Sequence, residues 1–286
     1  MGSQEIEKIK DVLVMSLQYR ADLAKSKRIV IKVGTSTLTH ENGRMNFVRM
    51  DRLAMVISEL INRGLEVILV SSGSISVGMG KLNLTERPNV MGAKQALAAI
   101  GQCELMNIYN RMFSAYNQMV AQILLTKNDV DDELKRQNID NTFEHLLKRH
   151  ILPIVNENDT VSIFEIKTIE HFGDNDTLSA VVSKLVFADL LIVLSDTDGF
   201  YNANPKECPE CELIDTVTEV TDEIRNYAAG NGTNRGTGGM VTKLNAAELV
   251  TKAGINMVLA NGNDPMIIFK ILDGLKIGTL FVGKNS

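Results

Sequence analysis

Two lysines stand where an ammonium group can meet a phosphate. Lys32 interrupts a β-branched apolar run shortly before Gly34, so its side chain is expected at the carboxyl end of a strand, beside uncovered backbone N–H groups. Lys243 lies about one turn into a helix that is expected to begin near Met240, after a glycine-rich stretch. Free N–H groups at such a helix start suit a polyphosphate. The two positions therefore predict a site for a phosphorylated ligand.

Each feature also has a purely structural interpretation. Lys32 can extend from a strand end to solvent, and residues 230–243, GNGTNRGTGGMVTK, can form a flexible surface linker. The spacing of this stretch departs from GxxxxGK[ST], and no GxGxxG precedes a helix, so neither the P-loop nor the dinucleotide fingerprint is met. The choice depends on whether other strand ends supply matching groups.

Polar clusters follow several of the expected strands. They lie at residues 32–36, 71–73, 156–159, 171–176 and 195–199. Taken alone, each can be a turn or a helix cap, with Asp176 capping the helix that follows. Because the carboxyl ends of parallel strands meet at one edge of a sheet, the five clusters together favour a single binding crevice.

The remaining chain alternates helix-like and strand-like segments. Helices are expected at residues 5–24, 47–62, 93–116, 131–149, 177–187 and 241–252, and strands at 29–33, 66–70, 119–125, 151–155, 190–194 and 257–260. This order predicts an α/β fold with a mostly parallel central sheet and helices on both faces. We expect one domain over residues 27–286, preceded by an amphipathic helix within residues 1–26 that could dock on the domain or on another subunit.

Composition narrows the classes of function. The chain has 286 residues, of which 44% are hydrophobic and 23% charged, as in folded globular proteins. A net charge of −5 disfavours a nucleic-acid partner. No signal peptide or apolar run of membrane-span length is found, so a cytoplasmic protein without a membrane partner is expected. Cys208 and Cys211 form a CxxC, but no second pair completes a zinc site, so we expect a reduced loop and no metal ligands.

Five motif regions, taken in order, resemble the amino-acid kinase family. They are KVGTST, VSSGSISVG, NENDT with FGDNDTLSA, LSDTDGFY and GTGGMVTKLNAAE, spread over residues 27–283. The pairing of NENDT with GDND is similar to the glutamate 5-kinase branch of the family. The resemblance implies the amino-acid kinase fold, with a glutamate-binding N-terminal part and an ATP-binding part over about residues 190–286. It also implies transfer of the ATP γ-phosphoryl group to the side-chain carboxylate of L-glutamate, giving L-glutamyl 5-phosphate in the first step of proline biosynthesis.

The resemblance, together with the placement of the lysines, assigns the catalytic roles. Lys32 is expected to contact the transferring phosphoryl group and Lys243 the phosphates as charge moves toward the leaving group. Asp176 would hold both ammonium groups. Mg²⁺ is expected on the ATP phosphates, coordinated largely by phosphate and water.

The family pattern also implies the binding residues. Asp159 is expected to pair with the α-ammonium group of glutamate, while Ser72 and Asn175 donate to its carboxylate oxygens, with Asn156 and Gly73 as neighbours. The ATP contacts that the resemblance implies are Lys32, Ser195, Asp196, Thr237, Gly238, Gly239, Met240, Val241, Thr242 and Lys243. The loop at residues 196–236 would enclose the adenine.

Further expectations concern partners and departures from the family pattern. A homo-oligomer, dimer or tetramer, is implied, and proline is expected as a feedback inhibitor near residues 161–171. This connection is longer than the family pattern, which leaves its contacts with glutamate open. The chain ends shortly after its last strand, so no C-terminal PUA domain is expected.

Two other functions are compatible with the residues. One is a kinase of the same fold that acts on aspartate, acetylglutamate or a nucleoside monophosphate; Asp159 argues for a substrate with a free α-amino group. The other is a non-catalytic sensor of nucleotide or amino acid, which both lysines and Asp176 disfavour.

Overall fold

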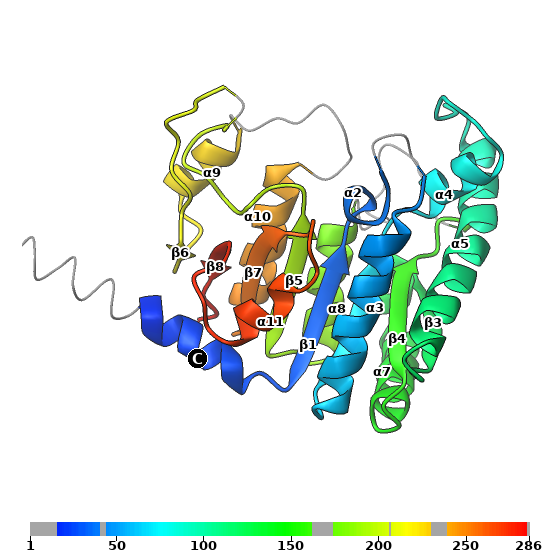
Figure 1. The fold of residues 1–286 in the computed structure, drawn as a ribbon, viewed down its shortest axis with the longest axis horizontal. Helices are drawn as coiled ribbons and strands as arrows, with labels where there is room; N and C mark the ends of the chain where they lie inside the picture. The colour runs from blue at the N-terminus through cyan, green and yellow to red at the C-terminus, as the bar shows by residue number, and fades with distance from the viewer. Residues whose placement is uncertain (1–15, 41–43, 162–173, 206, 230–238, 285–286) are drawn as a thin grey trace, which may run out of the picture.

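A central sheet organises the computed structural model, which describes residues 16–40, 44–161, 174–205, 207–229 and 239–284. The eight strands are β1 Arg28–Val33, β2 Glu66–Ser71, β3 Val120–Leu125, β4 Leu152–Glu157, β5 Leu190–Ser195, β6 Thr216–Val217, β7 Asn256–Asn261 and β8 Thr279–Phe281. Their order across the sheet is β3-β4-β2-β1-β5-β7-β8-β6 (Figure 1). Only the β7–β8 pair among them is antiparallel. The predicted α/β fold with a mostly parallel sheet is confirmed.

The helices include all those expected from hydrophobic periodicity after residue 26. They are α2 Thr35–Leu38, α3 Phe47–Asn62, α4 Ser74–Lys81, α5 Met91–Ser114, α6 Lys127–Asp131, α7 Glu133–Leu147, α8 Asn175–Leu185, α9 Asp222–Ala229, α10 Met240–Thr251 and α11 Ile267–Leu272. The helices α2, α4, α6, α9 and α11 occupy segments that the sequence patterns did not identify as helical. Each has eight residues or fewer, which is about two turns and too short for a clear 3.6-residue periodicity.

The helix predicted over residues 131–149 is confirmed as α7, which begins two residues later, whereas the short helix α6 before it was not predicted. Asp132 adopts an extended conformation, with φ −78° and ψ 121°, and separates α6 from α7. Its carboxylate accepts from the Lys135 N–H at 2.9 Å and caps α7. Thr126 and Asp129 form a capping box at the start of α6. Aspartate favours such caps over helix interiors, and an acidic cluster here marks a boundary.

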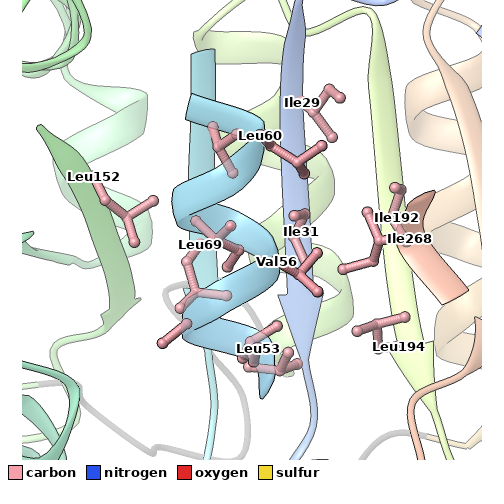
Figure 2. Packing of buried hydrophobic residues seen from close by; sticks show 14 of the residues in the cluster. Ile29, Ile31, Leu53, Val56, Leu60, Leu69, Leu152, Ile192, Leu194 and Ile268 are labelled. Carbon is pink, nitrogen blue, oxygen red and sulfur yellow. The ribbon is translucent and has the colours of Figure 1, made fainter. Parts of the chain in front are cut away.

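Helices cover both faces of the sheet because successive strand residues point to opposite sides. Ile29 and Ile31 of β1 belong to the core closed by α3 and α5, whereas Val30 belongs to the core closed by α8 and α10. Figure 2 shows Ile29 and Ile31 beside Val56 and Leu60 of α3. In Figure 1, α3 lies in front of the sheet and α8 behind it.

The described end of the leading helix packs on this same domain. Residues 16–22 are helical and continue into the 3₁₀-helix η1 Leu23–Lys25, while residues 1–15 lie outside the described part of the chain. Arg20 is fully buried and donates to the carbonyl groups of Ile277 and Gly278 at 2.8 and 3.0 Å, and to the Asp215 carboxylate at 2.8 Å. The helix end is therefore tied to the strand pair β6–β8. No helix in the described part of the chain has the length and apolar character needed to cross a membrane.

Candidate active site

Asp176 lies between the two lysines identified from the sequence. The Lys32 ammonium group is 2.6 Å from Asp176 Oδ1, and the Lys243 ammonium group is 3.1 Å from Asp176 Oδ2. Lys32 and Lys243 are each 7% exposed and Asp176 is 1% exposed. The structure therefore brings together in three dimensions three residues that are far apart in the sequence.

Strand alternation explains how Lys32 reaches this cluster. Val30, two residues earlier in β1, packs in the core closed by α8 and α10, and Lys32 points to the same face. Asp176 lies in the first turn of α8 and Lys243 in the first turn of α10. The Thr242 hydroxyl lies 3.0 Å from Asp176 Oδ2 and 2.8 Å from the Gly239 carbonyl, which joins the start of α10 to Asp176.

Neighbouring charges keep Asp176 ionised. Burial alone would raise the pKa of this carboxyl group, but the Lys32 and Lys243 ammonium groups outweigh burial and hold the pKa of Asp176 below its usual range. Asp174, not Asp176, caps α8 by accepting from the Thr177 N–H at 2.8 Å. Burial raises the pKa of Asp174, and the charge of Asp176 adds to this effect. Lys32, Lys243 and Asp176 together carry a charge of +1, which favours an approaching anion.

Two glycines leave space around this charge. A Cβ at Gly34 would lie 3.6 Å from the Lys32 Nζ, so glycine keeps the approach to the ammonium group open. The second is Gly239, the N-cap of α10, which has no side chain with which to cover the first-turn N–H groups. Among the described residues, nothing lies within 4 Å of a Cβ built at Gly239. Thr237 and Gly238 lie outside the described residues.

A second cluster adjoins the first through the start of α8. The side-chain amide of Asn175 donates to the Ser71 carbonyl at 2.8 Å, to the Ser72 hydroxyl at 2.8 Å and to Asn156 Oδ1 at 3.0 Å. Asn156, at the end of β4, donates in turn to Gln102 Oε1 at 2.8 Å. Because Asn175 and Asp176 are consecutive, one helix start positions the amide cluster and the lysine cluster together.

The hydrogen bonds fix the orientation of the Asn175 amide. Its two N–H hydrogens are shared among three acceptors, and the Ser71 carbonyl can only accept, so Nδ2 must face Ser71. The family pattern implied that Asn175 donates to a substrate carboxylate; in the structure its N–H groups donate to protein acceptors, and Oδ1, an acceptor, would suit an ammonium group. Ser72 accepts from Asn175 and retains its hydroxyl hydrogen for donation to a carboxylate.

Asp159 lies at the same end of the sheet as these residues. Its Oδ2 accepts from the Ser74 hydroxyl at 3.0 Å, and Ser74 is the first residue of α4. Gly73, between Ser72 and Ser74, has a φ of +98°, a left-handed conformation that favours glycine. The sharp turn after β2 thus presents Ser72 to Asn175 and Ser74 to Asp159.

Ser195 and Asp196 extend the site across β1 to the other half of the sheet. Leu194 pairs with Val33 of β1, so Ser195 lies one residue beyond, at the same edge as Lys32. The Ser195 hydroxyl donates to Asp196 Oδ1 at 3.1 Å. The predicted convergence of strand ends is thus found for the described residues on both sides of β1.

Gln102 was not predicted from the sequence. It lies in α5, is 8% exposed, accepts from the Asn156 amide, and lines a small pocket together with Ser74 and Asp159. A polar residue within a long helix gives no sequence signal of this role, because its partner is 54 residues away.

A surface hollow lies at the opposite edge of the sheet from the clustered residues. It has a volume of about 550 Å³ and is lined by Asp22, Lys25, Ser26, Lys184, Phe187, Ala188, Asp189, Ala253, Gly254, Ile255 and Asn256. Most of these residues precede β1, β5 and β7, at the amino ends of the strands. The hollow contains none of the clustered residues.

Comparison with known proteins gives a family and close relatives. The family model described as "Amino acid kinase family" matches residues 27–261. The chain is 55% identical to a glutamate 5-kinase of Clostridium perfringens over 267 residues, which cover 93% of this chain and 99% of the relative. It is 52% identical to a glutamate 5-kinase of Listeria monocytogenes, with 93% and 97% covered, and 52% identical to one of Enterococcus faecalis, with 92% and 97% covered.

Solved structures of lower identity share the fold. A carbamate kinase of Giardia lamblia, bound to AMP-PNP, aligns with a TM-score of 0.64 at 16% identity and covers 91% of this chain and 100% of its own. A UMP kinase of Bacillus anthracis aligns with a TM-score of 0.61 at 16% identity and covers 91% of this chain and 97% of its own. These matches establish the architecture and leave the substrate to be argued from the site.

Proposed function

The chain belongs to the amino acid kinase family and, within it, to the glutamate 5-kinases, and from this premise we propose how its residues transfer the ATP γ-phosphoryl group to L-glutamate. The product is L-glutamyl 5-phosphate, the first intermediate of proline biosynthesis. The observation that carries the proposal is the placement of Asp176 between two buried lysines, next to the amide cluster around Asn175.

The acceptor needs no general base. A glutamate side chain has a solution pKa of about 4.3, so its carboxylate is ionised at neutral pH. The main barrier is electrostatic, because an anion must approach the negatively charged γ-phosphate. Phosphoryl transfer is catalysed mainly by alignment and charge neutralisation. The two buried lysines near the carboxyl end of β1 supply both the alignment and the charge neutralisation.

We assign the two lysines to different parts of the phosphoryl transfer. Lys32, at the end of β1, lies between the Ser72 side and the Ser195 side, so it is placed to contact the transferring group. Lys243, in the first turn of α10, is placed to stabilise the phosphates as charge moves toward the leaving group. Asp176 orients both ammonium groups and contributes no proton, since its low pKa keeps it ionised.

The amide cluster is proposed to bind the amino acid. Ser72 donates its hydroxyl hydrogen to a carboxylate oxygen, and Asn175 Oδ1 and Asp159 accept from the α-ammonium group. Such acceptors favour a substrate with a free amino group. Ser195, Asp196 and residues 237–243 are proposed as the ATP contacts.

Mg²⁺ is proposed to enter with ATP. The described residues contain no group of three or more His, Cys, Asp or Glu side chains that could hold a metal ion, and Asp176 already faces two lysines. This donor set does not fit an ion held by protein ligands alone, but Mg²⁺ commonly keeps phosphate and water ligands. The ion would neutralise phosphate charge.

The remaining expectations stay predictions. They include a homo-oligomer, feedback by proline, a cytoplasmic location, the division into a glutamate-binding and an ATP-binding part, and the absence of nucleic-acid and membrane partners. The connection expected to bind proline falls mostly within residues 162–173, outside the described residues.

An assay for acyl phosphate tests the reaction and the substrate together. The protein is incubated with ATP, Mg²⁺ and L-glutamate, and hydroxylamine traps the product as the γ-hydroxamate. We expect a strong hydroxamate signal with L-glutamate and a much weaker one with L-aspartate or N-acetyl-L-glutamate. With UMP as the acceptor, the protein should consume no ATP. Nucleotide binding without any phosphorylated product would favour the sensor instead, and a stronger response to another acceptor would favour a kinase of different specificity.

A further inference from the structure

The CxxC pair lies in the loop between β5 and β6, and backbone contacts join the two arms of this loop. Tyr201 and Leu213 form an antiparallel bridge across the loop. Next to the bridge, the Asn202 N–H donates to the Glu212 carbonyl at 3.1 Å, and the Glu212 N–H donates to Asn202 Oδ1 at 2.9 Å. The two arms of the loop are thus held side by side.

A buried threonine clamps both arms to the sheet. Thr279 of β8 is 0% exposed, and its hydroxyl accepts from the Phe200 N–H at 2.8 Å while it donates to the Ile214 carbonyl at 2.6 Å. The Ile214 N–H donates to the Phe200 carbonyl at 2.8 Å. This clamp gives the loop base a fixed geometry.

The two cysteines lie at the ends of one tight turn. The Cys211 N–H donates to the Cys208 carbonyl at 3.1 Å, and the Cys208 N–H donates to the Asn204 carbonyl at 2.8 Å. A four-residue turn closed by such a bond keeps its end Cα atoms within about 7 Å. Disulfides span Cα separations of about 4.4–6.8 Å, so the backbone of this turn already suits a disulfide between Cys208 and Cys211. Both thiols are free and partly exposed.

We propose that Cys208 and Cys211 form a reversible dithiol–disulfide site that reacts with low-molecular-weight disulfides. The thiolate of one cysteine attacks a sulfur of the small disulfide, forms a mixed disulfide and releases one small thiol. The second thiolate attacks the mixed disulfide, closes the protein ring and releases the second small thiol. The protein dithiol is oxidised, the small disulfide is reduced to two thiols, and each departing thiolate takes up one proton.

The surroundings favour this chemistry over a zinc site. Structural zinc takes about four ligands. Among the described residues no third His, Cys, Asp or Glu side chain joins the pair in a group that could hold a metal ion. The remaining cysteine, Cys103, is exposed on α5, which packs beside β3 at the other end of the sheet. It serves as an internal reference for an isolated thiol.

Mass spectrometry of the full-length protein tests the proposal. After treatment with oxidised glutathione, the folded protein is expected to lose two hydrogens at residues 208–211 and to carry glutathione only at Cys103. The Cys103→Ser variant should still close the ring. The Cys208→Ser and Cys211→Ser variants should each hold glutathione on the remaining cysteine of the pair. Cleavage of the oxidised protein after Glu210 should leave the two fragments joined until a reductant is added.

A comparison of folded and unfolded protein tests the contribution of the turn. At equal ratios of oxidised to reduced glutathione, the closed ring should be about tenfold more populated in the folded protein than in urea, because the turn lowers the cost of closure. Stable glutathione adducts on both Cys208 and Cys211 would overturn the proposal. So would equal ring closure in the two states, or a loss of two hydrogens that persists in the Cys208→Ser variant.

Discussion

At the scale of single residues, Asp176 sets the separation of the two lysines, because each of its oxygens faces a different ammonium group. Two buried ammonium groups that share one carboxylate are strongly coupled to it and to each other. Removing either lysine leaves Asp176 with one of these cations, which raises its pKa. Each lysine is thus proposed to act on the bound phosphates and also affects the position of the other lysine.

Replacing either lysine should therefore reduce turnover. We expect Lys32→Met and Lys243→Met each to lower kcat by about 10²–10³-fold, the effect of removing one electrostatic stabiliser. Steady-state kinetics with the hydroxamate assay measures this, and circular dichroism checks that the variants are folded. Lys184→Met, an exposed position on α8, is the matched control and should keep normal kinetics. Unchanged turnover in either active-site variant would contradict the assigned roles.

Gln102 provides a second prediction, since it accepts a hydrogen bond from the Asn156 amide and so orients this residue of the amide cluster. In Gln102→Leu the Asn156 amide loses its acceptor and can rotate, which disturbs the hydrogen bond to Asn175. We expect the KM for L-glutamate to rise about tenfold, or about 1.4 kcal/mol, while the KM for ATP stays constant. The exposed Gln122→Leu variant on β3 is the control. Equal changes in both KM values would point to a general loss of structure.

The same residues show what the sequence could indicate. Lys32, Lys243 and Asp176 were predicted because their residue types recur in recognisable motifs at strand and helix ends. The orientation of Asn175 was not predictable, because it depends on the carbonyl of Ser71, 104 residues away. Gln102 gives no signal in the sequence for the same reason.

At the scale of elements, α4 and α5 pack with their backbones in contact. A Cβ at Gly78 would lie 2.1 Å from the Leu97 carbonyl oxygen, and a Cβ at Gly101 would lie 1.7 Å from the Ser74 carbonyl oxygen. Ser74 also donates to Asp159. The separation of the two helices therefore affects the position of a proposed substrate contact.

Gly101→Ala should push these helices apart. We expect the free energy of unfolding to fall by about 1–3 kcal/mol from overpacking, and the KM for L-glutamate to rise about tenfold because Ser74 and Asp159 move. Urea unfolding and steady-state kinetics measure the two effects. Gly92→Ala on the same helix is the control, since nothing lies within 4 Å of its Cβ among the described residues, and it should be neutral or stabilising by about 0.5 kcal/mol. A stable Gly101→Ala protein with normal kinetics would show that the contact can relax.

The end of the leading helix is the second element with a testable role. Arg20→Met removes a buried cation that donates to Asp215 and to carbonyl groups before β8. We expect a loss of about 3–5 kcal/mol in the free energy of unfolding, as for breaking a buried ion pair. Arg52→Met removes a half-exposed pair with Asp264 and should cost less than about 1 kcal/mol. Similar urea midpoints for the two variants would contradict an anchoring role.

At the scale of the whole molecule, the strand order explains why the site forms at β1. The chain passes from β1 to β2 on one side, while β5 joins β1 on the other, so the connections leave this strand in opposite directions. Open sheets bind ligands at such a point. Alternating apolar segments were enough to predict this architecture. They were not enough to predict the edge strand β6, which has two residues and no periodicity, or the short helix α6, whose start depends on a capping box.

This arrangement predicts that the two substrates protect different backbone segments from hydrogen exchange. L-Glutamate should slow exchange at residues 72–74 and 156–159, whereas a non-hydrolysable ATP analogue should slow it at residues 195–197 and 240–243. The start of α8 should respond to both ligands, because Asn175 belongs to the amide cluster and Asp176 to the lysine cluster. Residues 252–256, at the opposite edge, serve as the control and should not change. Protection of the same segments by both ligands would mean that β1 does not separate two subsites, and the assignment of Lys32 to the transferring group would lose its geometric basis.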